Sequence, residues 1–147
     1  MKIENMKFPI MIFRAGNVEV FKQKEYLLVC RNSDIKRGDF ENAIVVDSKM
    51  ESLMVDKVLR KKKLRRAYYH PDIIISIFDF IFDPSFEIEL VFKDEHPNIS
   101  LEQIKEKVIV AVSNNINIWS SNHDVDKLIN QVKRVDTIQR LFKLIQY

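Results

Sequence analysis

A change in the spacing of apolar residues divides this chain into two kinds of predicted secondary structure. Apolar and charged side chains alternate through residues 86–93, the pattern of a strand with one buried and one solvated face. We expect Ile88 and Leu90 to be buried there, and Glu87 and Glu89 to be exposed. In the C-terminal third, apolar residues recur every three or four positions instead, which predicts helices.

The N-terminal part of the chain carries the other predicted strands. Residues 8–13 (FPIMIF) are continuously apolar and predict a buried strand, and residues 18–21 return beside it as a hairpin turning near Gly16. Residues 43–47 predict a third strand, and a short turn leads into a fourth from about residue 51 to residue 59.

Three connecting segments are less regular. Residues 22–31 mix charged and apolar side chains in a way that favours a helix, and residues 32–42 are polar and predict a loop. The Ile and Phe content of residues 72–83 favours a strand, but their polar side chains fall on one helical stripe between Pro71 and Pro84. We prefer the helix for this segment.

The C-terminal residues predict a series of helices. Ser100 and Gln103 form a capping box, Trp119 lies in a loop, and Asp136 either caps a separate last helix or sits inside a continuous one. The apolar stripe of these helices is made by Leu101, Ile104, Val108, Ala111, Val112, Val125, Leu128, Ile129, Val132, Val135, Ile138, Leu141, Phe142 and Ile145.

The order of elements sets the expected fold class. Strands that precede helices, without strict alternation, predict α+β: a mostly antiparallel sheet of four to five strands with the C-terminal helices packed on one face. The 147 residues are the size of one ordinary domain, so we expect a single domain over residues 1–147.

Composition excludes several classes of function. Gly16 and Gly38 are the only glycines in the sequence, so neither a dinucleotide-binding nor a Walker phosphate loop can be written. Cys30 is the only cysteine, which excludes a disulfide framework, and we expect it to be a packed core thiol at the end of the first helix. The apolar run at residues 73–82 is half a membrane span. We expect a cytoplasmic protein without membrane contact or cofactor.

The titratable residues do not form a recognisable catalytic or metal-binding motif. His70, His96 and His123 lie outside the usual zinc-binding spacings, and the acids near His96 and His123 fit a polar loop and a helix start. His123 follows Ser121 closely, but adjacent residues rarely orient one another for nucleophilic catalysis. We expect Ser121 or Asn122 to cap a helix instead.

A metal-dependent nuclease is a further alternative, because Pro71 and Asp72 precede a strand that bears Glu87 and Glu89. That class usually places an acid two residues before a lysine on the strand. Val91 occupies this position before Lys93, and the one matching triplet, Asp47 to Lys49, lies upstream of that strand. The carboxylates of residues 72–83 fit the solvent edge of a helix better than an acid–base pair. The sequence therefore predicts a protein that is not an enzyme.

The strongest candidate site is a cluster of positive charges. Residues 57–66 hold seven basic side chains and no acid, while the rest of the chain has 17 basic and 21 acidic residues. Such a cluster is typical of a solvated edge strand. It also suits the binding of an acidic protein face, or of a nucleic acid whose bases stack on neighbouring aromatic rings. The candidate partner-binding residues are Lys57, Arg60, Lys61, Lys62, Lys63, Arg65, Arg66, Tyr68 and Tyr69.

The first 55 or so residues resemble small bacterial immunity proteins, the partners of polymorphic toxins. The resemblance rests on the arrangement of FPIMIF, VEVFKQKEYLLVC and AIVVDSKMESLMV as a hairpin, a helix and a strand pair. It implies a non-enzymatic inhibitor that binds another protein, and it assigns no functional residue. We therefore expect a protein-binding protein with an acidic partner. The alternative is a nucleic-acid-binding module that uses residues 57–66.

Overall fold

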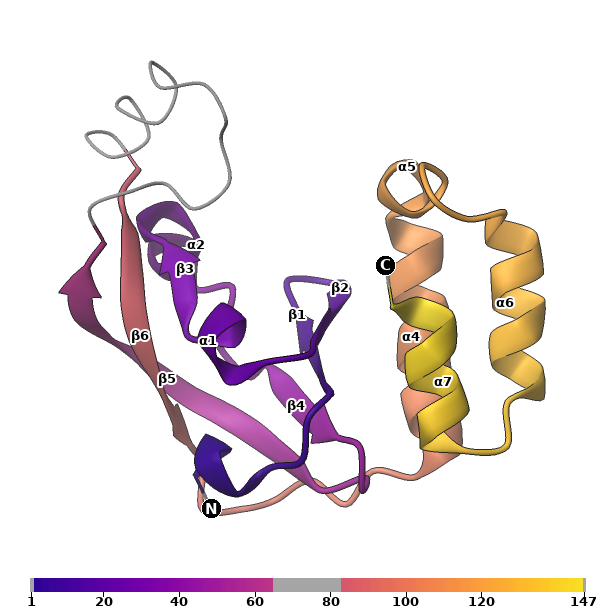
Figure 1. Cartoon of the computed structure of the whole chain (residues 1–147), viewed down its shortest axis with the longest axis horizontal. Helices are drawn as coiled ribbons and strands as arrows, with labels where there is room; N and C mark the ends of the chain where they lie inside the picture. Colours follow the sequence, from indigo (N-terminus) through magenta and orange to yellow (C-terminus); the bar gives the residue numbers. More distant parts are fainter. Residues whose placement is uncertain (1, 65–82, 147) are drawn as a thin grey trace.

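The computed structural model describes residues 2–64 and 83–146, and it has a curled sheet beside a layer of helices (Figure 1). Within these residues, six strands form one antiparallel sheet in the order β2-β1-β4-β5-β6-β3. The strands are β1 Ile10–Arg14, β2 Asn17–Phe21, β3 Val29–Arg31, β4 Ile44–Asp47, β5 Ser52–Lys63 and β6 Ser85–Phe92. The helices are η1 Ile3–Asn5, α1 Lys24–Leu27, α2 Asn32–Arg37, α4 Leu101–Asn114, α5 Ile116–Trp119, α6 Val125–Arg134 and α7 Ile138–Ile145. The α+β class is confirmed.

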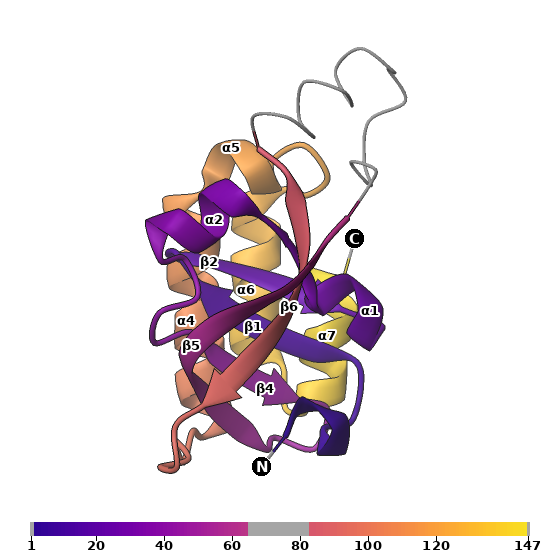
Figure 2. The same ribbon diagram turned by 90° about the vertical axis from the view of Figure 1, so that its left-hand side faces the viewer.

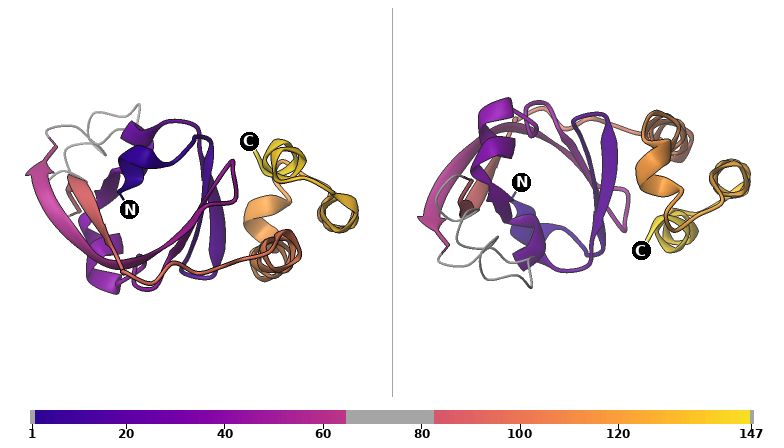
Figure 3. Two further views of the ribbon diagram at one scale, coloured as in Figure 1. Left: turned by 90° about the horizontal axis from the view of Figure 1, so that it is seen from below. Right: turned by 90° about the horizontal axis from the view of Figure 1, so that it is seen from above.

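The sheet is curled (Figure 3), and the buried side chains form two separate cores. The inner core fills the inside of the curl, and the helix core lies between α4–α7 and the outer face of β2, β1 and β4. The inner core consists of Ile3, Met6, Ile10, Ile12, Leu27, Cys30, Phe40, Ala43, Val45, Leu53, Val55, Ile88 and Leu90. The helix core consists of Met11, Val18, Val46, Ile104, Val108, Ala111, Val112, Trp119, Leu128, Val132, Val135, Ile138, Leu141, Phe142 and Ile145.

The two cores explain the continuously apolar β1. Ile10 and Ile12 belong to the inner core, whereas Met11 between them belongs to the helix core, and all three are fully buried. Successive side chains of a strand point to opposite faces, so a strand covered on both faces has no polar position. The hairpin turn to β2 is formed by Ala15 and Gly16, both with positive φ, as a tight two-residue hairpin requires.

β5 carries the sheet around its curl. Its first residues pair with β4, and the remainder pairs with β6 through two irregularities, between Val55 and Lys57 and between Arg60 and Lys62. Such bulges bend a strand and increase its twist. The sheet therefore turns at β5 instead of continuing flat.

Two predictions in the region before β4 are wrong. Residues 22–31 form only the single turn α1 and then the strand β3, which adds a sixth strand to the four or five expected. Pairing of β3 with β6 buries Cys30, so tertiary contacts override the local helical pattern. Residues 32–42 are not all loop, because residues 32–37 form the helix α2. At the start of α2, Asp83 accepts hydrogen bonds from the Ser33 amide at 2.8 Å and from the Ser33 hydroxyl at 2.7 Å.

The C-terminal helices agree with their predicted stripe. The capping box of Ser100 and Gln103 is present at the start of α4. The last two helices are separate, and the cap of α7 is Thr137, while Asp136 forms an ion pair with Arg140. The expected cap at Ser121 or Asn122 is wrong, because the Asp124 side chain caps α6. Trp119 lies in the short helix α5 instead of a loop. The segment at residues 72–82 lies outside the described residues.

The alternation in β6 gives a direct test of the fold. Ile88 and Leu90 are buried and Glu87 and Glu89 are exposed, as predicted. Replacing Leu90 with Ala is expected to lower the free energy of unfolding by about 2–5 kcal/mol, because it leaves a cavity in the inner core. The Glu89→Ala change is expected to stay within about 0.5 kcal/mol in urea titrations of the same protein. Equal losses at the two positions would contradict the assigned faces of β6.

The Cys30 thiol lies in β3 at 6% exposure, not at the end of a helix, although its predicted burial is confirmed. Burial raises the pKa of this thiol from 9.0 to about 12. A protonated, buried thiol is a poor nucleophile. We therefore expect slow labelling of the native protein by a thiol reagent at neutral pH, measured against the urea-unfolded chain. Equally fast labelling of both states would contradict the assigned burial.

The raised pKa also links Cys30 to stability at high pH. The unfolded chain releases this proton near its ordinary pKa of 9.0, whereas the folded chain holds it to about 12. The thiol's contribution is thus complete below about pH 9 and is lost as the pH rises toward 12. The difference in unfolding free energy between the wild type and Cys30→Ala should shrink between pH 8 and pH 11 in urea titrations. A constant difference would show that the thiol titrates alike in both states.

Candidate binding surface

The basic half of β5, residues 56–63, holds the described part of the predicted charge cluster. Every side chain in it except Val58 is exposed. Lys57, Arg60, Lys61, Lys62 and Lys63 are thus brought together on one strand. The remaining predicted contact residues lie outside the described residues: Arg65, Arg66, Tyr68 and Tyr69.

The basic half of β5 extends beyond its neighbour on one side. β4 pairs with β5 only through Ser52, Leu53 and Met54, and the Val55 amide makes one further bond to the Ala43 carbonyl at 2.8 Å. Within the described ranges, β5 then pairs with β6 alone. Figure 2 shows these two strands crossing the face of the molecule that points away from the helices α4–α7. The cations therefore lie on an edge that the helix layer does not cover.

The register with β6 divides the cations between the two faces of the sheet. Arg60 lies opposite buried Ile88, so it shares the inner face, where its guanidinium lies 5.6 Å from the ring centroid of Phe86. It also donates a hydrogen bond to Asn32 Oδ1 at 2.9 Å. Lys62 lies opposite exposed Glu87 and shares the outer face. The basic half of β5 thus presents charge in two directions.

Acids on β6 balance part of this charge. Lys61 forms an ion pair with Glu89, and its hydrogen bond holds the pKa of that carboxyl below the usual range. Both side chains are about half exposed, so water screens the pair and it contributes little to stability. Together with Glu87 opposite Lys62, it makes the outer face a mixed surface with an excess of positive charge.

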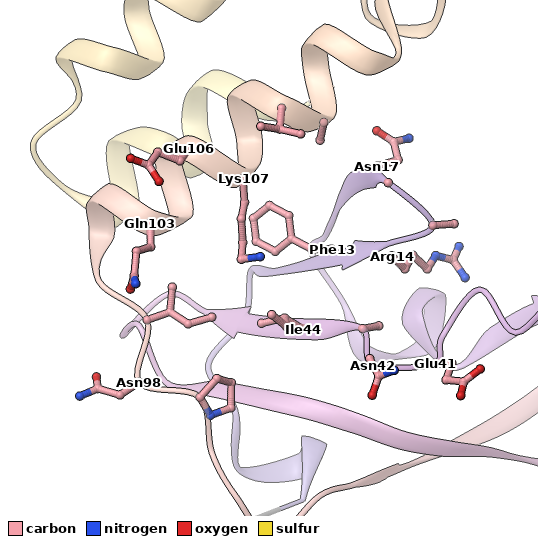
Figure 4. Close-up of a pocket in the computed structure, with 17 residues that line it drawn as sticks. Phe13, Arg14, Asn17, Glu41, Asn42, Ile44, Asn98, Gln103, Glu106 and Lys107 are labelled. Carbon is pink, nitrogen blue, oxygen red and sulfur yellow. The ribbon is translucent and has the colours of Figure 1, made fainter.

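Elsewhere on the molecule, a groove of about 730 Å³ lies between the β1–β2 turn, the start of β4 and α4 (Figure 4). Phe13 and Ile44 supply apolar surface, and Lys107 of α4 extends toward them. Arg14 also borders the groove, but its guanidinium is engaged by Glu19 at 2.9 Å and lies 4.3 Å from the centroid of the Phe40 ring. The groove is lined by positive and negative charges and by both polar and apolar side chains, so it does not select one class of ligand.

Two residues of the catalytic patterns in the sequence, Asp47 and Ser121, make hydrogen bonds to the backbone. The Asp47 carboxylate of the nuclease-like triplet is fully buried and accepts three backbone N–H bonds, from Lys7 at 2.9 Å, Lys49 at 2.8 Å and Glu51 at 2.9 Å. The Ser121 hydroxyl donates to the Ile118 carbonyl at 2.8 Å. Within residues 2–64 and 83–146, His, Cys, Asp and Glu do not gather in groups of three or more that could hold a metal ion.

Sequence reasoning missed the groove and the anchoring of α2. The groove joins residues of the β1–β2 turn to residues of α4 almost a hundred positions later. The Asp83 carboxylate reaches α2 from 50 positions away. Local patterns carry no signal for such pairings. The charge cluster was visible because its members are consecutive in the sequence.

The helices of the described chain are all too short or too polar to cross a membrane. Comparisons of the chain with protein-family models, with curated proteins and with solved structures give no match.

Proposed function

We propose that this chain is a non-enzymatic binding protein that covers an acidic face of another protein with the basic half of β5. In this role it acts as an inhibitor of the immunity type. The observation that carries the proposal is the row of exposed cations on a strand that extends past its neighbour, on the side away from the helix layer. Clustered charges of one sign steer the encounter with an oppositely charged surface.

The acids of β6 favour a protein partner over a nucleic acid. A nucleic acid carries uniform, dense negative charge, so Glu87 and Glu89 beside the cations would repel it. A protein face has separate charges of both signs and can place a cation opposite each of these acids. The partner that fits is therefore a protein surface that is acidic overall and contains a few basic residues.

An apolar side chain lies among the charges. Leu59 is 39% exposed and lies opposite Glu89, between Val58 and Arg60. Interfaces of this kind combine a few apolar anchors, which hold the complex, with surrounding charges, which set the rate of association. Inhibition then follows from occlusion of the partner's surface and requires no chemistry from this chain.

The proposal predicts different responses of fold and function to one triple change. Replacing Lys61, Lys62 and Lys63 together with Ser should alter the free energy of unfolding by less than about 1 kcal/mol, because exposed charges contribute little. The same protein used as bait in a native lysate should recover at least about tenfold less of the wild-type partner at low salt. The control is Lys127→Ser, an exposed lysine on α6 in the helix layer. It should recover the partner as the wild type does.

Three outcomes would contradict the proposal. One is a wild-type bait that recovers RNA or DNA and no stoichiometric protein. Another is equal recovery of the partner by the triple variant and the wild type. The third is a large loss of stability in the triple variant, which would show that these lysines hold the fold together.

A further inference from the structure

The strand edge that carries the cations also has backbone groups directed away from β6. We infer that this edge of β5, at Lys57 to Arg60, receives an extended acidic segment of the partner as an added strand. This inference rests on the proposed function, and it names the chemistry of the partner and the mode of contact. The partner chain would hydrogen-bond to the backbone of β5, while its acidic side chains would meet the cations.

The backbone of this stretch is suited to pairing. Between the two bulges, Lys57, Val58, Leu59 and Arg60 keep regular register with Val91, Leu90, Glu89 and Ile88. In an antiparallel ladder, alternate residues direct both N–H and C=O toward the neighbouring strand, and the residues between them direct both groups away from it. Every second residue of this stretch therefore presents its N–H and C=O on the side that β4 does not reach within the described chain.

The side chains of the same stretch select the occupant by charge. Lys57 and Leu59 alternate with Val58 and Arg60, so each face of the edge offers one apolar group and one cation. Directly opposed charges of unlike sign stabilise a strand pair, and like charges destabilise it. An incoming strand with acids at alternate positions places an acid opposite the single cation on one face. The apolar or polar residues between these acids lie on the other face of the edge.

Charge also argues against a second copy of this chain as the occupant. Two β5 edges paired with one another would bring Lys57 and Arg60 of one copy against the same cations of the other. Lysines on an edge are a common means of preventing such pairing. The same feature that opposes self-association therefore favours an acidic strand, because main-chain hydrogen bonds supply affinity and the alternate side chains supply specificity.

Three synthetic peptides and the full-length wild-type protein test this inference. The probe is a peptide of roughly eight residues, an ordinary strand length, in which Glu and Thr alternate. A second peptide has Lys in place of Glu. A third keeps the Glu side chains but carries N-methyl groups on alternate backbone nitrogens, which removes its donors along one edge. Binding is measured by fluorescence anisotropy at low and high salt, and hydrogen exchange is followed at the amides of residues 57–60.

The expected result depends on both backbone and charge. The acidic peptide should bind, more weakly at high salt, and should slow exchange at alternate amides of this stretch. The N-methylated peptide should bind at least about tenfold more weakly, which corresponds to the loss of one or two hydrogen bonds. The basic peptide should not bind. A Lys57→Glu, Lys62→Glu variant should lose the acidic peptide, whereas the matched control Lys127→Glu in the helix layer should retain it.

The possible failures are distinguishable. Equal binding of the acidic and N-methylated peptides, without slowed exchange, would overturn strand addition and leave a charge-mediated binding surface intact. Binding of the basic peptide, or unchanged binding by the Lys57→Glu, Lys62→Glu variant, would overturn both this inference and the proposed contact surface. Absence of binding by all three peptides overturns strand addition, while recovery of the partner from lysate separately decides the proposed function.

Discussion

Replacing Trp119 with Ala is expected to lower the free energy of unfolding by about 3–5 kcal/mol, since it removes the largest side chain of the helix core. Trp119 is 1% exposed, and its indole N–H lies 3.4 Å from Asn17 Oδ1 of β2. It therefore connects the short helix α5 to the sheet. The variant should be followed in urea by circular dichroism, because Trp119 is the only tryptophan and its fluorescence is lost with it.

Two further variants test this interpretation. Trp119→Phe keeps most of the buried ring volume and should cost less than the alanine change. Replacing Ile118 with Ala should stay within about 0.5 kcal/mol, because this neighbour in α5 is 52% exposed. A loss below about 1 kcal/mol for Trp119→Ala would mean that α5 does not hold the helix layer against β2.

Replacing Asp47 with Ala is the second change expected to have a large effect, with a loss of about 3 kcal/mol or more. Its carboxylate joins the N-terminal segment at Lys7 to the turn between β4 and β5 through three backbone N–H bonds. The amides of Lys49 and Glu51 bind Oδ1, and the amide of Lys7 binds Oδ2. Alanine would leave these donors without their acceptor.

Replacing Asp47 with Asn distinguishes the contributions that the two ends of this connection make to stability. Asp47→Asn can keep an acceptor oxygen for the Lys49 and Glu51 amides while placing an amide group against Lys7. Its stability in urea titrations should therefore fall between those of the wild type and Asp47→Ala. The control is Asp94→Ala, in the exposed loop after β6, which should stay within about 0.5 kcal/mol. A neutral Asp47→Ala change would show that Asp47 is not a structural residue of the turn.

The sequence predicted those elements whose pattern reflects a face that is buried along its whole length. The alternation in β6 follows from one buried and one solvated face, and the apolar run of β1 follows from two buried faces. The stripe in α4 follows from its packing on the sheet. In each case, consecutive residues record the contacts of a regular element, so their period is sufficient evidence.

The elements that were missed depend on residues far away in the chain. β3 consists of Val29–Arg31, too short to show a period, and it is a strand because β6 pairs with it. α2 begins where Asp83 accepts bonds from Ser33. At the candidate surface, the sequence identified the cations but not their division between two faces, which depends on the bulges in β5. The ion pair of Lys61 with Glu89 depends on the same register.

The association rate of the isolated partner, measured at several salt concentrations, tests the central claim most directly. The wild type should associate rapidly at low salt and slow steeply as salt rises, because screening removes the steering by the basic half of β5. The variant with Lys61, Lys62 and Lys63 replaced by Ser should associate slowly and with little salt dependence, while Lys127→Ser should match the wild type. Identical rates and salt slopes for all three proteins would show that the partner binds elsewhere on the molecule.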